Sequence, residues 1–100
     1  MENVVFFSGG SHPELSKSIA NKCGKELSPI EIVKFADGES KPELGENVRG
    51  RTVIIIQSTY ATPESATDNF MMVTTIADAA KRASAKEIIL VAPYHGFSRQ

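Results

Sequence analysis

The sequence has 100 residues, which is enough for one domain with one hydrophobic core. Hydrophobic residues make up 41% and charged residues 23%, so the composition excludes a disordered or fibrous protein and fits a globular one. The net charge of −1 provides no general attraction for a polyanion, and nucleic acid is therefore not an expected partner.

No apolar run approaches the roughly 20 residues that span a bilayer. The N-terminus carries Glu2 and no basic residues before an apolar stretch, so neither membrane insertion nor secretion is expected. The lone cysteine, Cys23, has no partner for an internal disulfide and lies on the apolar side of a predicted helix, where a small buried thiol is expected. These features favour a reducing, cytoplasmic location.

The first predicted unit is a strand, a glycine-rich turn and a helix. The run 4–7 is short, continuous and β-branched or aromatic, which is typical of a strand buried on both faces at the centre of a sheet. Ser11 and Glu14 match a capping box and predict a helix start, and Gly24 supplies a stop. Helical spacing on the expected buried face is carried by Leu15, Ile19 and Cys23.

The middle of the sequence predicts a projecting hairpin arm. A second strand is expected over 30–35, followed by a tight turn at the Asp37-Gly38 pair. The return segment, 43–48, is polar apart from Leu44 and Val48, so the arm should bury little and project from the domain.

The last third of the sequence alternates strand, helix and strand. The run 52–56 is the strongest predicted strand, the spacing of apolar residues over 70–83 predicts a long amphipathic helix, and 88–91 predicts the last strand. Strands that alternate with helices indicate an α/β fold with a mainly parallel sheet flanked by helices, here with the projecting β-hairpin arm.

Candidate binding residues follow the predicted strands, because ligands of open α/β sheets collect outside the carboxyl ends of strands. The turn 8–11 could hold an anion through backbone N–H groups, but it lacks the Lys of a P-loop, and a plain strand-to-helix turn is favoured. On an extended arm, Phe35, Asp37 and Glu39 would share one face and offer an aromatic platform beside two carboxylates, which suits adenine. The alternative is an ordinary hairpin turn.

The C-terminal segment offers a second set of polar groups. Arg99 and Gln100 could bond to phosphate oxygens, although a terminal arginine is more often solvated. His95 has no carboxylate or second histidine nearby in sequence and is read as a loop histidine. No paired-cysteine metal pattern or nucleophile motif is present. Spacing alone therefore indicates a small α/β domain, with nucleotide binding as one candidate function.

Six segments stand out when they are considered together: FSGGSHPEL at 7–15, FADGE at 35–39, ENVRG at 46–50, IQST at 56–59, KRASAK at 81–86 and PYHGFSRQ at 93–100. In this order and at this spacing they resemble the N-terminal half of ribose-phosphate pyrophosphokinases. The resemblance covers essentially the whole chain and implies a fold of the type I phosphoribosyltransferase kind. It further implies that 1–100 is the ATP-side domain and that the second domain is absent from this chain.

The resemblance also implies an activity and its site residues. The family transfers pyrophosphate from ATP to ribose 5-phosphate with Mg²⁺, and ATP binds between the subunits of a homo-oligomer, in hexamers built from dimers. Phe35, Asp37 and Glu39 would then cover the adenine of ATP held mainly by a neighbouring subunit, and Arg99 and Gln100 would contact the phosphates. Two further residues, Arg49 and Ser84, resemble residues near the family's regulatory phosphate site.

The family's metal-contacting histidine, catalytic loop and ribose-phosphate loop lie beyond the matched segments. We therefore expect no catalytic and no metal-binding residue within this chain, and little turnover by the chain alone. One alternative is a non-catalytic regulatory or assembly subunit of the same family. A generic nucleotide-binding module is the remaining alternative.

Overall fold

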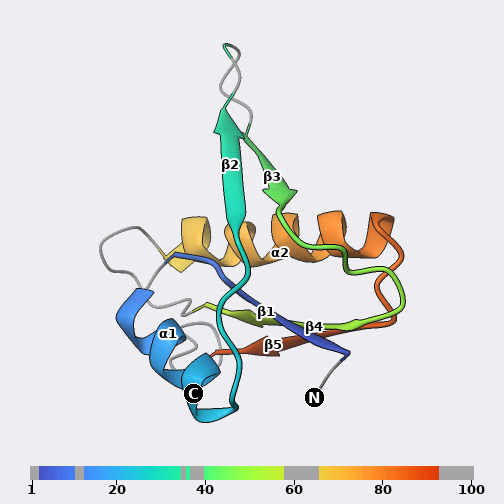
Figure 1. Ribbon diagram of the computed structural model, residues 1–100. Helices are drawn as coiled ribbons and strands as arrows, with labels where there is room; N and C mark the ends of the chain where they lie inside the picture. The colour runs from blue at the N-terminus through green and yellow to red at the C-terminus, as the bar shows by residue number, and fades with distance from the viewer. Residues whose placement is uncertain (1–2, 11–12, 35, 37–39, 58–65, 93–100) are drawn as a thin grey trace, which may run out of the picture.

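Figure 1 shows the structure, a computed structural model that describes residues 3–10, 13–34, 36, 40–57 and 66–92. Strands and helices follow one another in the order β1 (Val4–Ser8), α1 (Pro13–Lys22), β2 (Ile30–Lys34), β3 (Ser40–Leu44), β4 (Thr52–Ile56), α2 (Ala66–Arg82) and β5 (Glu87–Val91). Neither helix of the described ranges is long and apolar enough to cross a membrane.

A parallel sheet with the strand order β1-β4-β5 forms the body of the domain. Val4 of β1 is aligned with Thr52 of β4, which is in turn aligned with Glu87 of β5. On its other side β1 forms a parallel bridge between Phe6 and Leu27, so it is flanked on both edges. The predicted α/β fold with a central first strand is confirmed.

Two hydrophobic clusters cover the two faces of this sheet, as alternation along the strands requires. The larger cluster joins β1 and β4 to α2, and its buried members are Val5, Phe7, Val48, Val53, Ile55, Ile76 and Ala80. A smaller cluster on the opposite face joins the same strands to α1, and its buried members are Phe6, Ala20 and Ile56. Helices therefore lie on both faces of the sheet, as Figure 1 shows.

The predicted buried face of α1 was wrong by one position. Ser16 and Ala20 are the buried residues of this helix, whereas Leu15 is 41% exposed. The small residues let the helix lie close to β1, and the Ser16 hydroxyl is satisfied there because Ser8 Oγ donates a hydrogen bond to Ser16 Oγ at 3.1 Å. The spacing of apolar residues alone could not reveal this polar contact.

Cys23 is exposed, so the expectation of a buried thiol was also wrong. The helix ends at Lys22, and Gly24 adopts a left-handed conformation with φ of 75°. The Gly24 N–H bonds to the Asn21 carbonyl at 2.9 Å and the Lys25 N–H to the Ala20 carbonyl at 3.0 Å, which is the Schellman pattern. The predicted stop at Gly24 is confirmed, and this turn leaves Cys23 in solvent.

The hairpin β2–β3 projects from the domain as predicted (Figure 1). Its strands are antiparallel and pair from Ile30 with Leu44 to Lys34 with Ser40. The return strand thus begins at Ser40, three residues before the predicted start at 43. At the base, Ile30 and Leu44 pack against the larger cluster, and the Gly45 N–H bonds to the Pro29 carbonyl at 2.8 Å.

The first prediction concerns the face of α2 that packs on the sheet. Ile76 is fully buried, so Ile76→Ala should lower the free energy of unfolding by about 2–5 kcal/mol through lost burial and a residual cavity. Met71 lies on the same helix but is 54% exposed, so Met71→Ala should change it by less than about 0.5 kcal/mol. Urea unfolding of both variants measures the difference, and equal losses would contradict the assignment of this face.

Candidate functional site

The carboxyl ends of the three parallel strands form one continuous edge. The Gly9 N–H, just after β1, donates to the Ile56 carbonyl of β4 at 3.0 Å. The Gln57 N–H, just after β4, donates to the Val91 carbonyl of β5 at 3.1 Å. Because ligands of open α/β sheets bind outside this edge, it is the first place to search for a site.

The crevice between the ends of β1 and β4 is filled by the Gln57 side chain. Gln57 is only 1% exposed, which is unusual for a polar residue. A Cβ atom added to Gly9 would lie 2.5 Å from Gln57 Cδ and 2.9 Å from Gln57 Cβ, so only glycine fits there. The Gly10 N–H is taken up locally, since it donates to Ser8 Oγ at 3.1 Å. These contacts favour the interpretation of 8–11 as a plain strand-to-helix turn.

The residues predicted to contact ATP lie outside the described residues. Phe35, Asp37 and Glu39 belong to the connection between Lys34 and Ser40, the last aligned pair of the hairpin. Arg99, Gln100 and His95 follow β5 beyond the described part of the chain. What the structure does place is the base of the arm, and the predicted roles of these residues stay predictions.

Arg49 and Ser84, which are 35 positions apart in the sequence, meet at the other end of the sheet. Arg49 forms an antiparallel bridge with Ala85, and the Gly50 N–H donates to the Ser84 carbonyl at 2.9 Å. Ser84 adopts a left-handed conformation with φ of 68°, which is uncommon for a residue other than glycine. This Arg49–Ser84 junction, residues 49–50 and 84–85, is exposed except for the half-buried Ala85.

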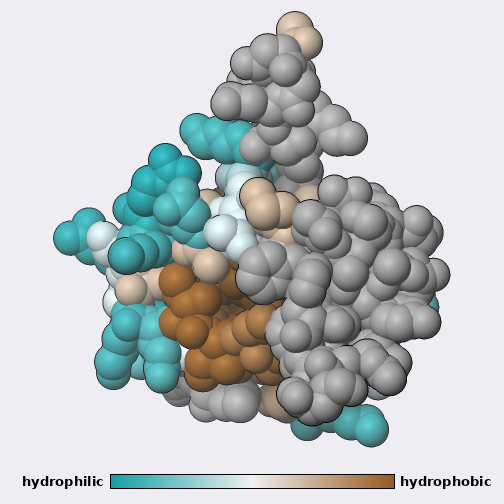
Figure 2. Space-filling model, turned by 180° about the vertical axis from the view of Figure 1, so that it is seen from behind, coloured by the Kyte–Doolittle hydropathy of each residue, from teal (hydrophilic) through white to brown (hydrophobic). Residues whose placement is uncertain are grey.

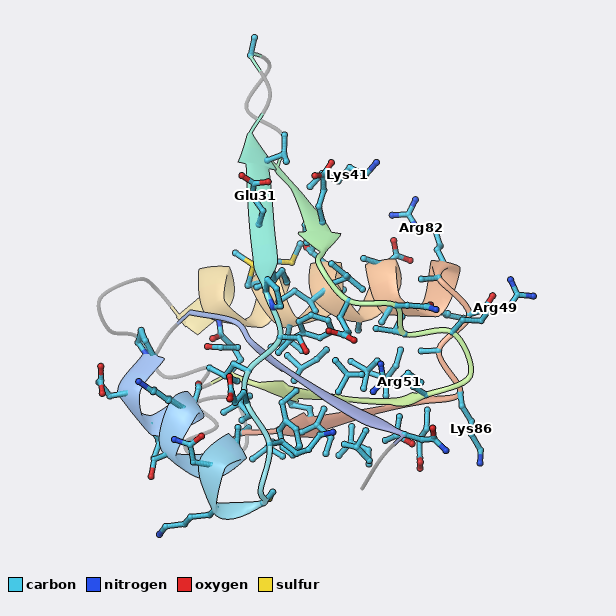
Figure 3. The ribbon with its side chains drawn as sticks, viewed as in Figure 1. Glu31, Lys41, Arg49, Arg51, Arg82 and Lys86 are labelled. Atoms are coloured by element: carbon cyan, nitrogen blue, oxygen red, sulfur yellow. The ribbon has the colours of Figure 1, made fainter. Side chains whose placement is uncertain are left out.

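The charges around the junction differ in how they are paired. Arg51 Nη1 lies 3.2 Å from Glu46 Oε2 and donates to the Asn47 carbonyl at 3.0 Å. Arg82 forms an ion pair with Asp78 at 2.6 Å. Within the described ranges the Arg49 guanidinium has no such carboxylate partner, and Figure 3 shows its side chain pointing away from the sheet. Arg49 is thus available to an anion in solution.

The structure also shows a cleft of about 300 Å³ that the sequence did not predict. It lies between β3 and the C-terminal half of α2, and its lining comprises Lys41, Pro42, Glu43, Leu44, Glu46, Ala79, Arg82 and Ala83. Two basic and two acidic side chains balance one another on an otherwise apolar lining. No local motif marks these residues, because only the docking of the hairpin beside α2 brings them together.

Metal ligation is not supported within the described part of the chain. No group of three or more His, Cys, Asp or Glu side chains there is placed to hold a metal ion.

Comparison with known proteins gives a consistent result. A model of the family described as the N-terminal domain of ribose phosphate pyrophosphokinase matches residues 4–100. A ribose-phosphate pyrophosphokinase of Fusobacterium nucleatum is 48% identical over 98 residues, which cover 98% of this chain and 30% of the relative. A second, from Chromobacterium violaceum, is 43% identical over 99 residues, which cover 99% of this chain and 29% of the relative.

Among solved structures, the crystal structure of phosphoribosylpyrophosphate synthetase from Mycobacterium smegmatis matches with a TM-score of 0.70 and 30% sequence identity. The match covers 91% of this chain and 30% of that one. The chain therefore spans about three tenths of the length of the relatives it matches.

The second prediction tests the filled crevice. Gly9→Ala should destabilise the domain by about 1–3 kcal/mol, because the added methyl group overlaps the Gln57 side chain. If this overlap is the cause, Gln57→Gly should relieve part of it, and the double variant should be more stable than the sum of the single effects by at least about 0.5 kcal/mol. Denaturant unfolding of the four proteins measures the coupling, and strict additivity would contradict the contact.

Proposed function

Because the chain belongs to the family of ribose-phosphate pyrophosphokinase N-terminal domains, we propose that it forms the ATP side of a ribose-phosphate diphosphokinase. In the proposed reaction the C1 hydroxyl oxygen of ribose 5-phosphate attacks the β-phosphorus of ATP. The bond from that phosphorus to the oxygen bridging the α- and β-phosphates breaks, and AMP leaves. The products are AMP and phosphoribosyl pyrophosphate. The single observation that carries this proposal is the family match over 4–100.

The arm is proposed to reach the adenine of ATP bound at a neighbouring subunit. Its strands pair from the base up to Lys34 and Ser40, and it stands clear of the sheet (Figure 1). A pair of hydrogen-bonded strands is stiffer than a loop and can carry Phe35, Asp37 and Glu39 beyond their own domain. The Phe35 ring would stack on the adenine, and the carboxylates would accept hydrogen bonds from its exocyclic amine.

The phosphates of ATP are assigned to Arg99 and Gln100. Charge-assisted bonds from a guanidinium would orient the phosphate chain, and such positioning is a main source of catalysis in phosphoryl transfer. The described residues offer no metal-ligand cluster, so we assign Mg²⁺ to the ATP phosphates as part of the substrate. The proposed assembly is a homo-oligomer, and the proposed location is the cytoplasm, where its substrates are produced.

The Arg49–Ser84 junction is proposed as a regulatory phosphate site. The backbone contact between Gly50 and Ser84 holds the two segments together, and the Arg49 side chain is exposed beside them. An exposed cation beside a serine hydroxyl suits the charge and the hydrogen-bonding capacity of a phosphate group.

The third prediction tests the arm in a full-length chimera, in which this chain replaces the matched 98 residues of the Fusobacterium nucleatum relative. Asp37→Ala should raise the KM for ATP about tenfold, the effect of losing one hydrogen bond of about 1.4 kcal/mol. The KM for ribose 5-phosphate should stay unchanged, because the arm is assigned to adenine alone. Release of AMP at varied ATP concentration measures both constants.

Glu31→Ala is the matched control, because Glu31 is an exposed carboxylate lower on the same arm (Figure 3). It should leave both constants unchanged. An unchanged KM for ATP in Asp37→Ala would overturn the adenine assignment. Absence of AMP release from a folded chimera would instead favour a non-catalytic assembly subunit.

The fourth prediction concerns the junction. Inorganic phosphate should bind the 100-residue chain, and Arg49→Ala should weaken that binding by about tenfold or more, since hydrogen bonds to charged groups are worth about 1.5–3 kcal/mol. Lys41→Ala removes an exposed cation from the arm and should have little effect. Phosphate titration followed by NMR measures both, and an equal loss in the two variants would show nonspecific attraction and contradict the site.

A further inference from the structure

β5 has an open edge. It is the last strand of the sheet, with β4 on one side and no other strand of the described ranges beyond it. The Val91 carbonyl accepts the Gln57 N–H, so Val91 directs its backbone groups towards β4. Backbone groups alternate in direction along a strand, and Ile88 and Leu90 therefore direct their N–H and C=O groups away from β4.

The side chains at this edge are apolar and unusually exposed. Ile89 is 40% and Leu90 38% exposed, although parallel strands of this composition are normally covered. Figure 2, which views the molecule from behind, shows strongly hydrophobic residues gathered at the centre of this face. We call Ile88, Ile89, Leu90 and Val91 the β5 edge patch.

Both sides of the strand contribute to the patch. Ile89 is aligned with Ile54, which packs in the cluster on the α1 side. Leu90 is aligned with Ile55, which packs in the cluster on the α2 side. The neighbours on β4 are thus covered at both faces, whereas the two β5 side chains are left partly in solvent. The hydrophobic clusters stop short of the edge on both sides.

Nothing in the patch resembles the usual protection of an exposed edge. Edge strands of water-soluble proteins carry charges, Pro or a bulge that blocks further pairing. The run Ile88 to Val91 has none of these charges or prolines, and its pairing with β4 is continuous. An edge of this kind is expected to be covered by another strand.

We propose that the β5 edge patch is the docking surface for a β-strand of the polypeptide that follows the N-terminal domain in full-length family members. This inference rests on family membership and does not depend on ATP binding. The matched relative is about three times as long as this chain, and the matched family is an N-terminal domain, so the relatives supply further polypeptide. β5 is also the last strand before the end of the matched region at residue 100.

Topology supports the same occupant. Sequential strands pair or lie side by side roughly two-thirds of the time, so the strand that follows β5 in a longer chain is the first candidate for its open edge. Such a strand would extend the parallel order β1-β4-β5 and continue both hydrophobic clusters. A second copy of this chain would instead bring two β5 strands together and interrupt the parallel order.

Amide hydrogen exchange tests the proposal, in the 100-residue chain and in the full-length chimera described above. The amides of Ile88 and Leu90 should exchange at least about tenfold more slowly in the chimera, because a docked strand accepts their hydrogen bonds. The amides of Ile89 and Val91 face β4 and serve as internal references that should be protected in both proteins. Equal exchange of Ile88 and Leu90 in the two proteins would overturn the proposal.

Two lysine variants separate the remaining outcomes. In the chimera, Leu90→Lys should abolish the added protection, whereas Met71→Lys, which places the same charge on the exposed surface of α2, should not. Sedimentation of the 100-residue chain tests for a second copy at the edge. A dimer that Leu90→Lys dissociates and Met71→Lys preserves would assign the patch to self-association and overturn the proposed occupant.

Discussion

The parallel pairing of β1 with β4 positions every other part of the domain. The two strands are separated by 43 intervening residues, and those residues contain α1, the hairpin arm and Arg49. Pairing is enforced from both faces, because Val5, Phe7, Val53 and Ile55 meet α2 on one side while Phe6 and Ile56 meet α1 on the other. A slip of one residue would move each set to the wrong face, so the register is strongly specified.

This register gives the two ends of the sheet different properties. At the carboxyl end, Gly9 and Gln57 close the crevice in which ligands of such folds commonly lie. At the amino end, Thr52 is aligned with Glu87, and the Lys86 N–H donates to the Arg51 carbonyl at 2.8 Å. The segments just outside this end are thereby joined, and Arg49 is set beside Ser84 as a consequence of strand pairing.

The sequence predicted best what depends on local pattern. The strand 52–56 was predicted at its observed bounds, since an uninterrupted β-branched run has few alternatives to a buried strand. The buried face of α1 was missed because Ser16 takes a core position through a hydrogen bond to Ser8, a partner that apolar periodicity ignores. Gln57 and the cleft beside β3 gave no local signal, because their surroundings come from segments distant in sequence. Family resemblance alone supplied the roles of Phe35, Asp37, Glu39, Arg99 and Gln100, and these roles remain predictions.

The arm and the β5 edge have the same physical implication for where a ligand can bind. A hairpin that leaves the hydrophobic core at Ile30 and Leu44 can bury its tip only against another polypeptide, and the same holds for the exposed side chains of β5. Meanwhile the crevice that an isolated α/β domain would offer is occupied by the domain's own Gln57. A domain with its internal crevice filled and its outer elements uncovered is suited to supply one wall of a pocket. The proposed ATP site is therefore best understood as a product of assembly, with this domain providing the stiff support from which the arm reaches its neighbour.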